Sequence, residues 1–296
     1  MLRVRSFSYI FQHNKAIRKI LFGLIILFFY ASSACTSLPE KINRTASQLN
    51  FQRLVLPGTG FTHVAYINAI KPHSQTLHVY LEGDGTPWLT THTIAADPTP
   101  RKPLMLELMS LDSTPAIYLG RPCYFGKSDE PSCHYTFWTQ DRYSETVVVS
   151  MAAALNHFLD QQFIKKQRIT TFRFFGHSGG GVLAMLLAEH FPTTRAVVTL
   201  AGNLDVTAWT NLHDYTPLTG LNPALRPSLP SNITQLHYAG VRDLVVPPSL
   251  VRKGIARQNT AELIVIDDAD HTCCWGSLWP HILDRLQSTN SIDSSD

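Results

Sequence analysis

The chain carries little charge, and it lacks the patterns that mark nucleotide or nucleic-acid binding. Charged residues make up 16% of its 296 residues, and the formal net charge is +3. No basic stripe, internal repeat or low-complexity segment is present, which argues against a nucleic-acid partner. The glycine-rich segment at 176–181 fits neither the G-x-x-x-x-G-K-[ST] loop nor the G-x-G-x-x-G spacing, which argues against these two phosphate-binding motifs.

The apolar run near the N-terminus is too short to cross a bilayer as a helix. It extends over Ile20–Tyr30 with Gly23 inside it, about half of the ~20 residues that a spanning helix needs. Basic residues precede it, and the small residues Ala31 to Ala34 follow it. This order predicts an export signal over residues 1–34, and an uncleaved membrane anchor is the alternative.

Cys35 directly follows these small residues. The arrangement resembles a bacterial lipoprotein signal, in which the cysteine becomes the lipidated N-terminus, although Ser32 stands where such signals usually carry Leu, Val or Ile. The resemblance implies a lipid anchor in the bilayer at Cys35. Thr36 in the second position implies sorting to the outer membrane, facing the periplasm. Residues 35–59 are expected to form a tether and N-terminal extension.

Cysteine is scarce, with five residues in the chain and no C-x-x-C pair, so a zinc site is not favoured. An exported protein meets an oxidising environment, in which the four cysteines after Cys35 can form disulfides in three ways. Cys123 and Cys133 bracket one loop and are the favoured pair. The adjacent Cys273 and Cys274 are awkward as a bridge of their own, and buried free thiols are the alternative.

Strand-like and helix-like runs alternate from residue 60 onward, which is typical of a mostly parallel sheet covered by helices. The expected strands are Thr62–Ile67, Leu77–Leu81, Ala116–Leu119, Thr171–Phe175, Ala196–Leu200, Gln235–Ala239 and Leu263–Ile266. The expected helices are Lys102–Ser110, Ser144–Phe163, Gly180–His190, Pro248–Gln258 and Trp275–Gln287. The sequence therefore predicts one α/β domain over residues 60–287, doubly wound, followed by a polar tail at 288–296.

Three long connections interrupt this alternation, at Gly83–Arg101, Arg121–Tyr143 and Asp205–Asn232. Long connections in compact α/β domains are usually functional or disordered, and these three contain too many aromatic residues for disorder. We expect them to wall a substrate pocket that includes Trp88 and Trp209, with residues 205–232 as a small lid. The alternative is that their aromatic side chains pack as satellite cores.

The most informative segment is the pentapeptide Gly176-His177-Ser178-Gly179-Gly180, between a strand-like and a helix-like run. A serine on a sharp strand-to-helix turn presents its hydroxyl for attack on an acyl carbon. The residues two before and two after it crowd each other, which explains the outer glycines. The alternative is a glycine-rich turn that binds an anion at the helix start.

A serine nucleophile needs a base, and the base needs an orienting acid. Asp243 and His271 follow later strands in the order Ser, acid, His, so all three can meet at one edge of the sheet. Asp205 is a rival acid because it follows the preceding strand. Asp267, Asp268 and Asp270 crowd the histidine loop, where they can cap a helix or shape a turn.

The pentapeptide around Ser178, the run Gly240-Val241-Arg242-Asp243 and the late Asp270-His271 together resemble the α/β-hydrolase family over roughly residues 60–287. The resemblance implies that Ser178 attacks the substrate, His271 carries the proton and Asp243 orients the imidazole. It also implies an oxyanion hole built from the backbone N–H of Gly179 and from the loop at Gly83 and Asp84.

Acidic residues in that loop depart from the usual pattern of such hydrolases. A carboxylate beside a developing oxyanion raises the barrier, so Glu82 and Asp84 must point away or pair with a cation, for which Arg121 and His177 are candidates. The sequence thus predicts a cell-envelope serine hydrolase that cleaves an ester or related acyl bond without metal or organic cofactor. The alternative is a non-catalytic envelope protein that uses the fold as a binding scaffold.

Overall fold

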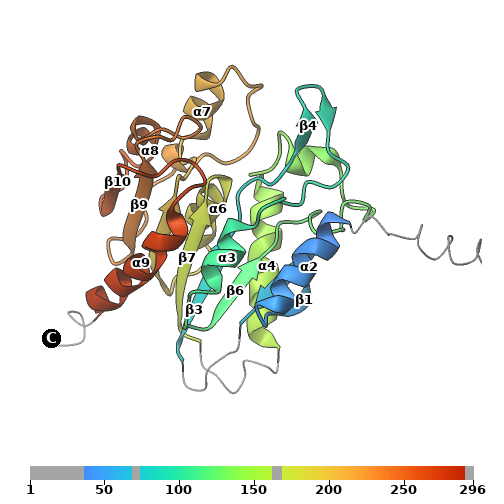
Figure 1. Ribbon diagram of the computed structural model, residues 1–296, viewed down its shortest axis with the longest axis horizontal. Coiled ribbons are helices and arrows are strands. Elements are labelled where there is room, and N and C mark those ends of the chain that lie inside the picture. The colour runs from blue at the N-terminus through green and yellow to red at the C-terminus, as the bar shows by residue number, and fades with distance from the viewer. Residues whose placement is uncertain (1–36, 69–73, 162–168, 291–296) are drawn as a thin grey trace, which may run out of the picture. The chain divides into compact units, whose positions relative to one another are not determined.

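An eight-stranded sheet runs through the computed structural model, which describes residues 37–68, 74–161 and 169–290 (Figure 1). The strand order is β1-β2-β6-β3-β7-β8-β9-β10. Strands β1 and β2 pair antiparallel, as do β2 and β6, and all other pairs are parallel. The strands are β1 (Gln52–Pro57), β2 (Thr62–Ile67), β3 (Thr76–Leu81), β6 (Ala116–Leu119), β7 (Thr171–His177), β8 (Thr194–Leu200), β9 (Thr234–Gly240) and β10 (Ala261–Ile266).

Helices cover both faces of the sheet and bury a separate apolar core on each (Figure 1). One face carries α4 (Glu145–Asp160), α6 (Gly179–Ala188) and α8 (Pro248–Gly254). The other face carries α2 (Leu38–Gln48), α3 (Leu104–Met109) and α9 (Trp275–Asn290). Because both faces are covered, the central strands read as continuous apolar runs, and successive residues such as Phe174 and Phe175 enter opposite cores. The predicted doubly wound, mostly parallel α/β fold is confirmed.

The long helix α4 begins as its sequence predicts. Ser144 caps it, its hydroxyl accepting a hydrogen bond from the Val147 backbone N–H at 3.4 Å. Val147, Met151 and Leu155, spaced four residues apart, are buried against the sheet. The end predicted at Phe163 lies outside the described residues, and the observed helix ends at Asp160.

Residues 38–57, within the segment predicted as a tether and N-terminal extension, form regular structure. They fold into α2 and then into β1, an edge strand of the sheet, so the sheet begins before residue 60. The polar composition of α2 conceals a narrow stripe of Ile42 and Ala46, four residues apart, which is buried. The predicted export signal, Cys35 and most of the polar tail lie outside the described residues. No helix among the residues described is long and apolar enough to cross a membrane.

The connections after the strands carry small elements of their own. A hairpin of β4 (Trp88–Thr90) and β5 (Thr93–Ile94) follows β3, and η1 (Tyr135–Trp138) follows β6. The segment predicted as a lid contains α7 (Val206–Leu212) and η2 (Pro223–Leu225), and its role as a lid stays a prediction. Disulfides join Cys123 to Cys133, as favoured, and Cys273 to Cys274, the adjacent pair that we judged awkward.

Candidate active site

Ser178 occupies a sharp turn between β7 and α6. Its backbone has φ 51° and ψ −121°, a left-handed conformation that residues with side chains adopt only when their surroundings impose it. The surroundings here are tight, since a Cβ on Gly176 would lie 2.2 Å from the Gly180 carbonyl oxygen. Glycine is therefore required on that side of the turn, and the turn holds the Ser178 side chain at the carboxyl end of β7.

His271 and Asp243 lie in line with this serine. The His271 Nε2 atom is 3.1 Å from the Ser178 Oγ atom, and the His271 Nδ1 atom is 2.9 Å from Asp243 Oδ2. Asp243 is 1% exposed, and its Oδ1 atom accepts hydrogen bonds from the backbone N–H groups of Val245 and Val246. The carboxylate is thus fixed, and it holds the proton of His271 on Nδ1, which leaves Nε2 to act on the serine.

Asp205, the rival acid, serves another purpose in the structure. It is the N-cap of α7, and its Oδ1 atom accepts hydrogen bonds from the Ala208 N–H and from the Asn222 side chain. Asp268 pairs with Arg242, and Asp270 accepts from the backbone N–H groups that follow His271. The structure therefore brings Asp243 to the Nδ1 atom of His271, and it brings none of these rival acids there.

The loop that carries His271 is fastened by its backbone. The His271 carbonyl oxygen accepts one hydrogen bond from His177 Nε2 at 2.7 Å and another from Trp275 Nε1 at 3.3 Å. Burial, with a contribution from neighbouring His271, lowers the pKa of His177 to about 4, so His177 is neutral near pH 7. A neutral His177 donates this bond without adding positive charge beside the base. The sequence suggested only a charge-pairing role for His177.

The loop at Gly83 and Asp84, predicted to supply part of an oxyanion hole, has one of its two N–H groups engaged. The Gly83 N–H donates to the Glu82 carboxylate oxygen at 3.1 Å, so it is already engaged. Among the described residues no acceptor faces the backbone N–H of Asp84 or of Gly179. A Cβ on Gly83 would lie 3.5 Å from the Ser178 Cβ atom, so the loop passes close to the nucleophile. The geometry therefore favours the N–H groups of Gly179 and Asp84 as the donors, with Gly83 providing the close approach.

The Asp84 carboxylate beside this hole is neutralised. Arg121 and Arg142 each place a guanidinium nitrogen 2.8 Å from one of its oxygens, and the Tyr143 hydroxyl donates to it at 2.7 Å. Burial alone would raise the Asp84 pKa, but the two arginine charges and the hydroxyl lower it to about 2. Arg121 was expected to pair with an acid of this loop, and it does. Arg142 and Tyr143 were not expected, because nearly 60 residues separate them from Asp84.

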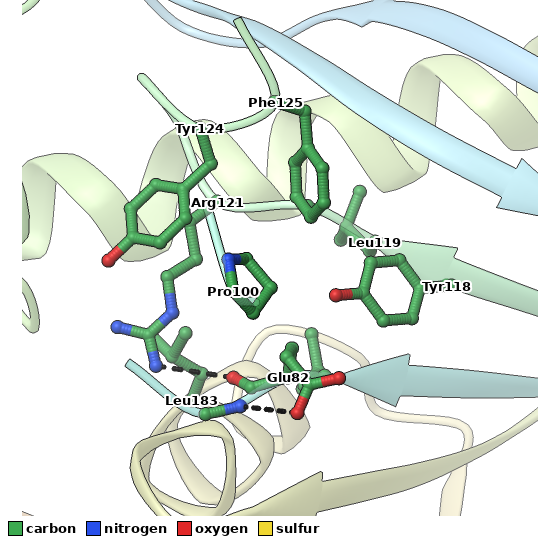
Figure 2. A pocket seen from close by; sticks show the side chains of 11 residues that line it. Glu82, Pro100, Tyr118, Leu119, Arg121, Tyr124, Phe125 and Leu183 are labelled. Atoms are coloured by element: carbon green, nitrogen blue, oxygen red, sulfur yellow. Dashed lines mark hydrogen bonds between the residues drawn. The ribbon is translucent and has the colours of Figure 1, made fainter. Parts of the chain in front are cut away.

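Glu82 lies behind the same loop, in the wall of a small cavity (Figure 2). Its carboxylate accepts from the N–H groups of Gly83 and Met105, yet burial raises its pKa to about 7. The cavity measures about 10 Å³, which is room for about one water. Tyr118 and Arg121 also line it, and the described residues give no partner to the Tyr118 hydroxyl or to two of the Arg121 nitrogens.

A second serine–histidine contact is structural. His63 Nε2 lies 2.8 Å from Ser150 Oγ, and both residues are fully buried between β2 and α4. The other ring nitrogen of His63 bonds the Gly120 carbonyl oxygen instead of a carboxylate, and burial lowers the His63 pKa to about 4. No substrate can reach this pair without unfolding the core.

The two tryptophans predicted to line the pocket lie on the connections after β3 and β8. Trp88 is 43% exposed on the hairpin β4–β5. Trp209 donates through Nε1 to the Val245 carbonyl oxygen, two residues after the acid. No group of three or more metal-binding side chains gathers in the part of the chain that the structure describes, and the four cysteines seen there are bonded in disulfides.

Comparison with known proteins places the fold. No protein-family model and no curated protein matches the chain. Solved structures do match. A membrane phospholipase A described as a bacterial virulence factor has a TM-score of 0.57 and 13% identity over 92% of this chain and 99% of its own. An esterase from Pyrococcus furiosus has a TM-score of 0.53 and 11% identity over 81% and 90%. The chain therefore has the α/β-hydrolase fold.

Proposed function

We propose that the chain is a serine hydrolase that cleaves an ester or related acyl bond through an acyl-enzyme on Ser178. The observation that carries this proposal is the chain of hydrogen-bonding distances, 3.1 Å from Ser178 to His271 and 2.9 Å from His271 to Asp243. A base within reach of a hydroxyl and an acid that orients the base are what nucleophilic catalysis by serine needs.

The reaction would proceed in two balanced halves. The Ser178 oxygen attacks the acyl carbon while His271 Nε2 takes the hydroxyl proton, and the N–H groups of Gly179 and Asp84 stabilise the oxyanion. The tetrahedral intermediate collapses, and His271 returns the proton to the leaving alcohol. Water then attacks the acyl-enzyme and gives a proton to His271. The second tetrahedral intermediate collapses, His271 returns the proton to the Ser178 oxygen, and the acid is released.

The alternative function, a non-catalytic binding scaffold, was suggested by the acidic residues Glu82 and Asp84 in the loop after β3. Asp84 does carry a charge beside the proposed oxyanion hole, but Arg121 and Arg142 lie against that carboxylate. Their two positive charges exceed its one negative charge, so the local field favours an oxyanion. The acidic loop therefore supports catalysis at Ser178 and gives the scaffold reading no advantage.

The substrate we propose is an apolar acyl ester. Aromatic and aliphatic side chains line the connections around Ser178, including Trp209 and Leu212. One structural neighbour is described as a membrane phospholipase A and another as an esterase, which is consistent with such a substrate.

We also place the protein in the cell envelope, as a lipoprotein anchored at Cys35. The support is the basic leader, the short apolar run and the small residues that precede the cysteine. A Cys35→Ser variant should no longer partition with detergent-solubilised membranes. Wild-type protein found wholly soluble in the periplasm would disprove the anchor and leave a plain secretory signal.

Hydrolysis of a short p-nitrophenyl ester tests the catalytic proposal. Ser178→Ala should lower kcat by several orders of magnitude while the protein keeps its melting temperature within a few degrees, because the turn and the core are untouched. Ser150→Ala is the matched control, since it removes the other serine that contacts a histidine. Ser150→Ala should keep its activity and lose about 1–3 kcal/mol of stability, as His63 loses its partner. Near wild-type activity in Ser178→Ala would refute the mechanism.

A further inference from the structure

Exposed apolar side chains gather on the segments that leave the carboxyl ends of the strands, around Ser178. We call this set the apolar rim: Trp88, Leu89, Tyr135, Leu212, Tyr215, Val241, Leu244 and Val245. Leu244 directly follows the acid Asp243 and is 85% exposed. The other large apolar side chains exposed in the described residues are Val55, Leu111, Leu225 and Val265. Leu225 lies toward the far end of α6 from Ser178, since its neighbour Arg226 bonds Glu189 at the C-cap of that helix.

One half of the rim is held rigidly beside the acid loop. Trp209 and His213 both direct a ring nitrogen at the Val245 carbonyl oxygen, at 3.1 and 2.8 Å. The Tyr215 ring packs on both of them, with centroids 5.2 Å away in each case. Segments far apart in sequence are thereby joined into one ridge, on which Leu212, Tyr215, Leu244 and Val245 are exposed.

The hairpin β4–β5 presents the other half, with Trp88 and Leu89. The Ala95 N–H closes the base of this hairpin by bonding the Pro87 carbonyl oxygen, and Trp138 Nε1 of η1 ties the base to the body by bonding the Ala95 carbonyl oxygen. Figure 1 shows the hairpin and α7 standing out beyond the same end of the sheet. Exposed apolar side chains gathered in this way mark a binding site for a protein or a membrane.

The start of the described chain lies at the same edge. A Cβ on Gly126, which belongs to the connection after β6, would lie 3.5 Å from the Pro39 side chain at the beginning of α2. Cys35 is three residues before Leu38, a length of about 10 Å when extended. A lipid anchor on Cys35 would therefore hold the apolar rim, and not the opposite end of the sheet, toward the bilayer.

We propose that the apolar rim docks on the surface of a lipid bilayer and that Ser178 takes its acyl ester from that bilayer. This inference rests on the proposed hydrolase function, which it extends by naming the occupant of the rim. Trp88 and Leu89 would enter from the hairpin after β3, and Leu212 and Leu244 would enter from the connections after β8 and β9. Apolar and aromatic side chains that enter the headgroup region gain free energy by leaving water.

The test uses the full-length protein, purified from membranes and reconstituted into phosphatidylcholine vesicles. Hydrolysis of p-nitrophenyl palmitate dissolved in the vesicles is divided by hydrolysis of water-soluble p-nitrophenyl acetate. In Leu212→Asp/Leu244→Asp this ratio should fall at least about tenfold, because each aspartate must leave water to dock. The matched control, Leu111→Asp/Leu225→Asp, adds the same charges at exposed leucines outside the rim and should keep the wild-type ratio.

A second measurement is independent of catalysis. Brominated phosphatidylcholine quenches tryptophan fluorescence on contact, so it should quench wild-type protein and inactive Ser178→Ala alike, and quench Trp88→Phe less. Failure of hydrolysis with intact quenching would refute the proposed function and keep the docking. An unchanged ratio in the rim variant, an equal loss in the control, or wild-type protein that brominated lipid does not quench would overturn the docking and point to a protein partner.

Discussion

Ser178 shows how one residue gains reactivity from its backbone. The left-handed turn costs of order 1–3 kcal/mol, which the packed glycines and the buried helix α6 must offset. The turn could be predicted from the sequence because its tight packing requires glycine two residues before Ser178, where a local pattern shows it. The partners of Asp84 are unreadable for the opposite reason, because nothing local in Arg142 or Tyr143 reveals that folding will bring them to the loop.

The two candidate acids give a prediction at the scale of single residues. Asp243→Asn should lower kcat by three to four orders of magnitude, since an amide beside Nδ1 favours the wrong tautomer of His271. Asp205→Asn should change kcat by less than about threefold and stability by less than about 1 kcal/mol, because asparagine also caps helices. Steady-state kinetics of both variants on one soluble ester makes the comparison. The reverse ranking would move the acid to Asp205.

At the scale of elements, the free energy of unfolding depends on the protonation of Glu82, which begins the connection after β3. Burial raises its pKa from 4.5 to about 7 in the folded state. Between these values the folded protein holds a proton that the unfolded chain has released, so this group's contribution to stability is lost as pH rises through that window. The loss is on the order of 3 kcal/mol, since each pKa unit corresponds to about 1.4 kcal/mol.

Glu82→Gln removes this titration and should therefore gain stability relative to wild type as pH rises from about 4.5 to 7. Urea unfolding at several pH values measures the difference. Glu145→Gln is the control, since Glu145 is exposed on α4 and its charge does not contribute to the raised pKa of Glu82. A stability difference between wild type and Glu82→Gln that stays constant across the window would show that the folded state does not hold the proton.

Elements were predictable where their burial follows a strong pattern. The strands β2 and β6 have the bounds that the sequence predicts, and the other five predicted strands differ from their predicted bounds by at most two residues at an end. Both α2 and β1 were missed because each buries little, α2 through two side chains and β1 through Leu56. Edge elements of this kind are specified by the neighbour they cover, which a local pattern does not contain.

At the scale of the whole molecule, the parallel sheet is what assembles the site. Strands β7, β9 and β10 run in one direction, so the connections that carry Ser178, Asp243 and His271 leave the same edge. The order of the three residues in the chain was therefore enough to predict that they meet. The apolar rim was only partly predictable, because exposure at Leu244 or Leu212 depends on how the connections pack.

Covalent labelling with a fluorophosphonate measures the central claim most directly, since the reagent traps a serine that a neighbouring base activates. Intact wild-type protein should gain one adduct, and mass spectrometry should map it to the tryptic peptide 174–195, whose only serine is Ser178. Ser178→Ala should gain none. A wild-type protein that stays unlabelled, or an adduct on Ser150, would contradict the account of Ser178 as the nucleophile.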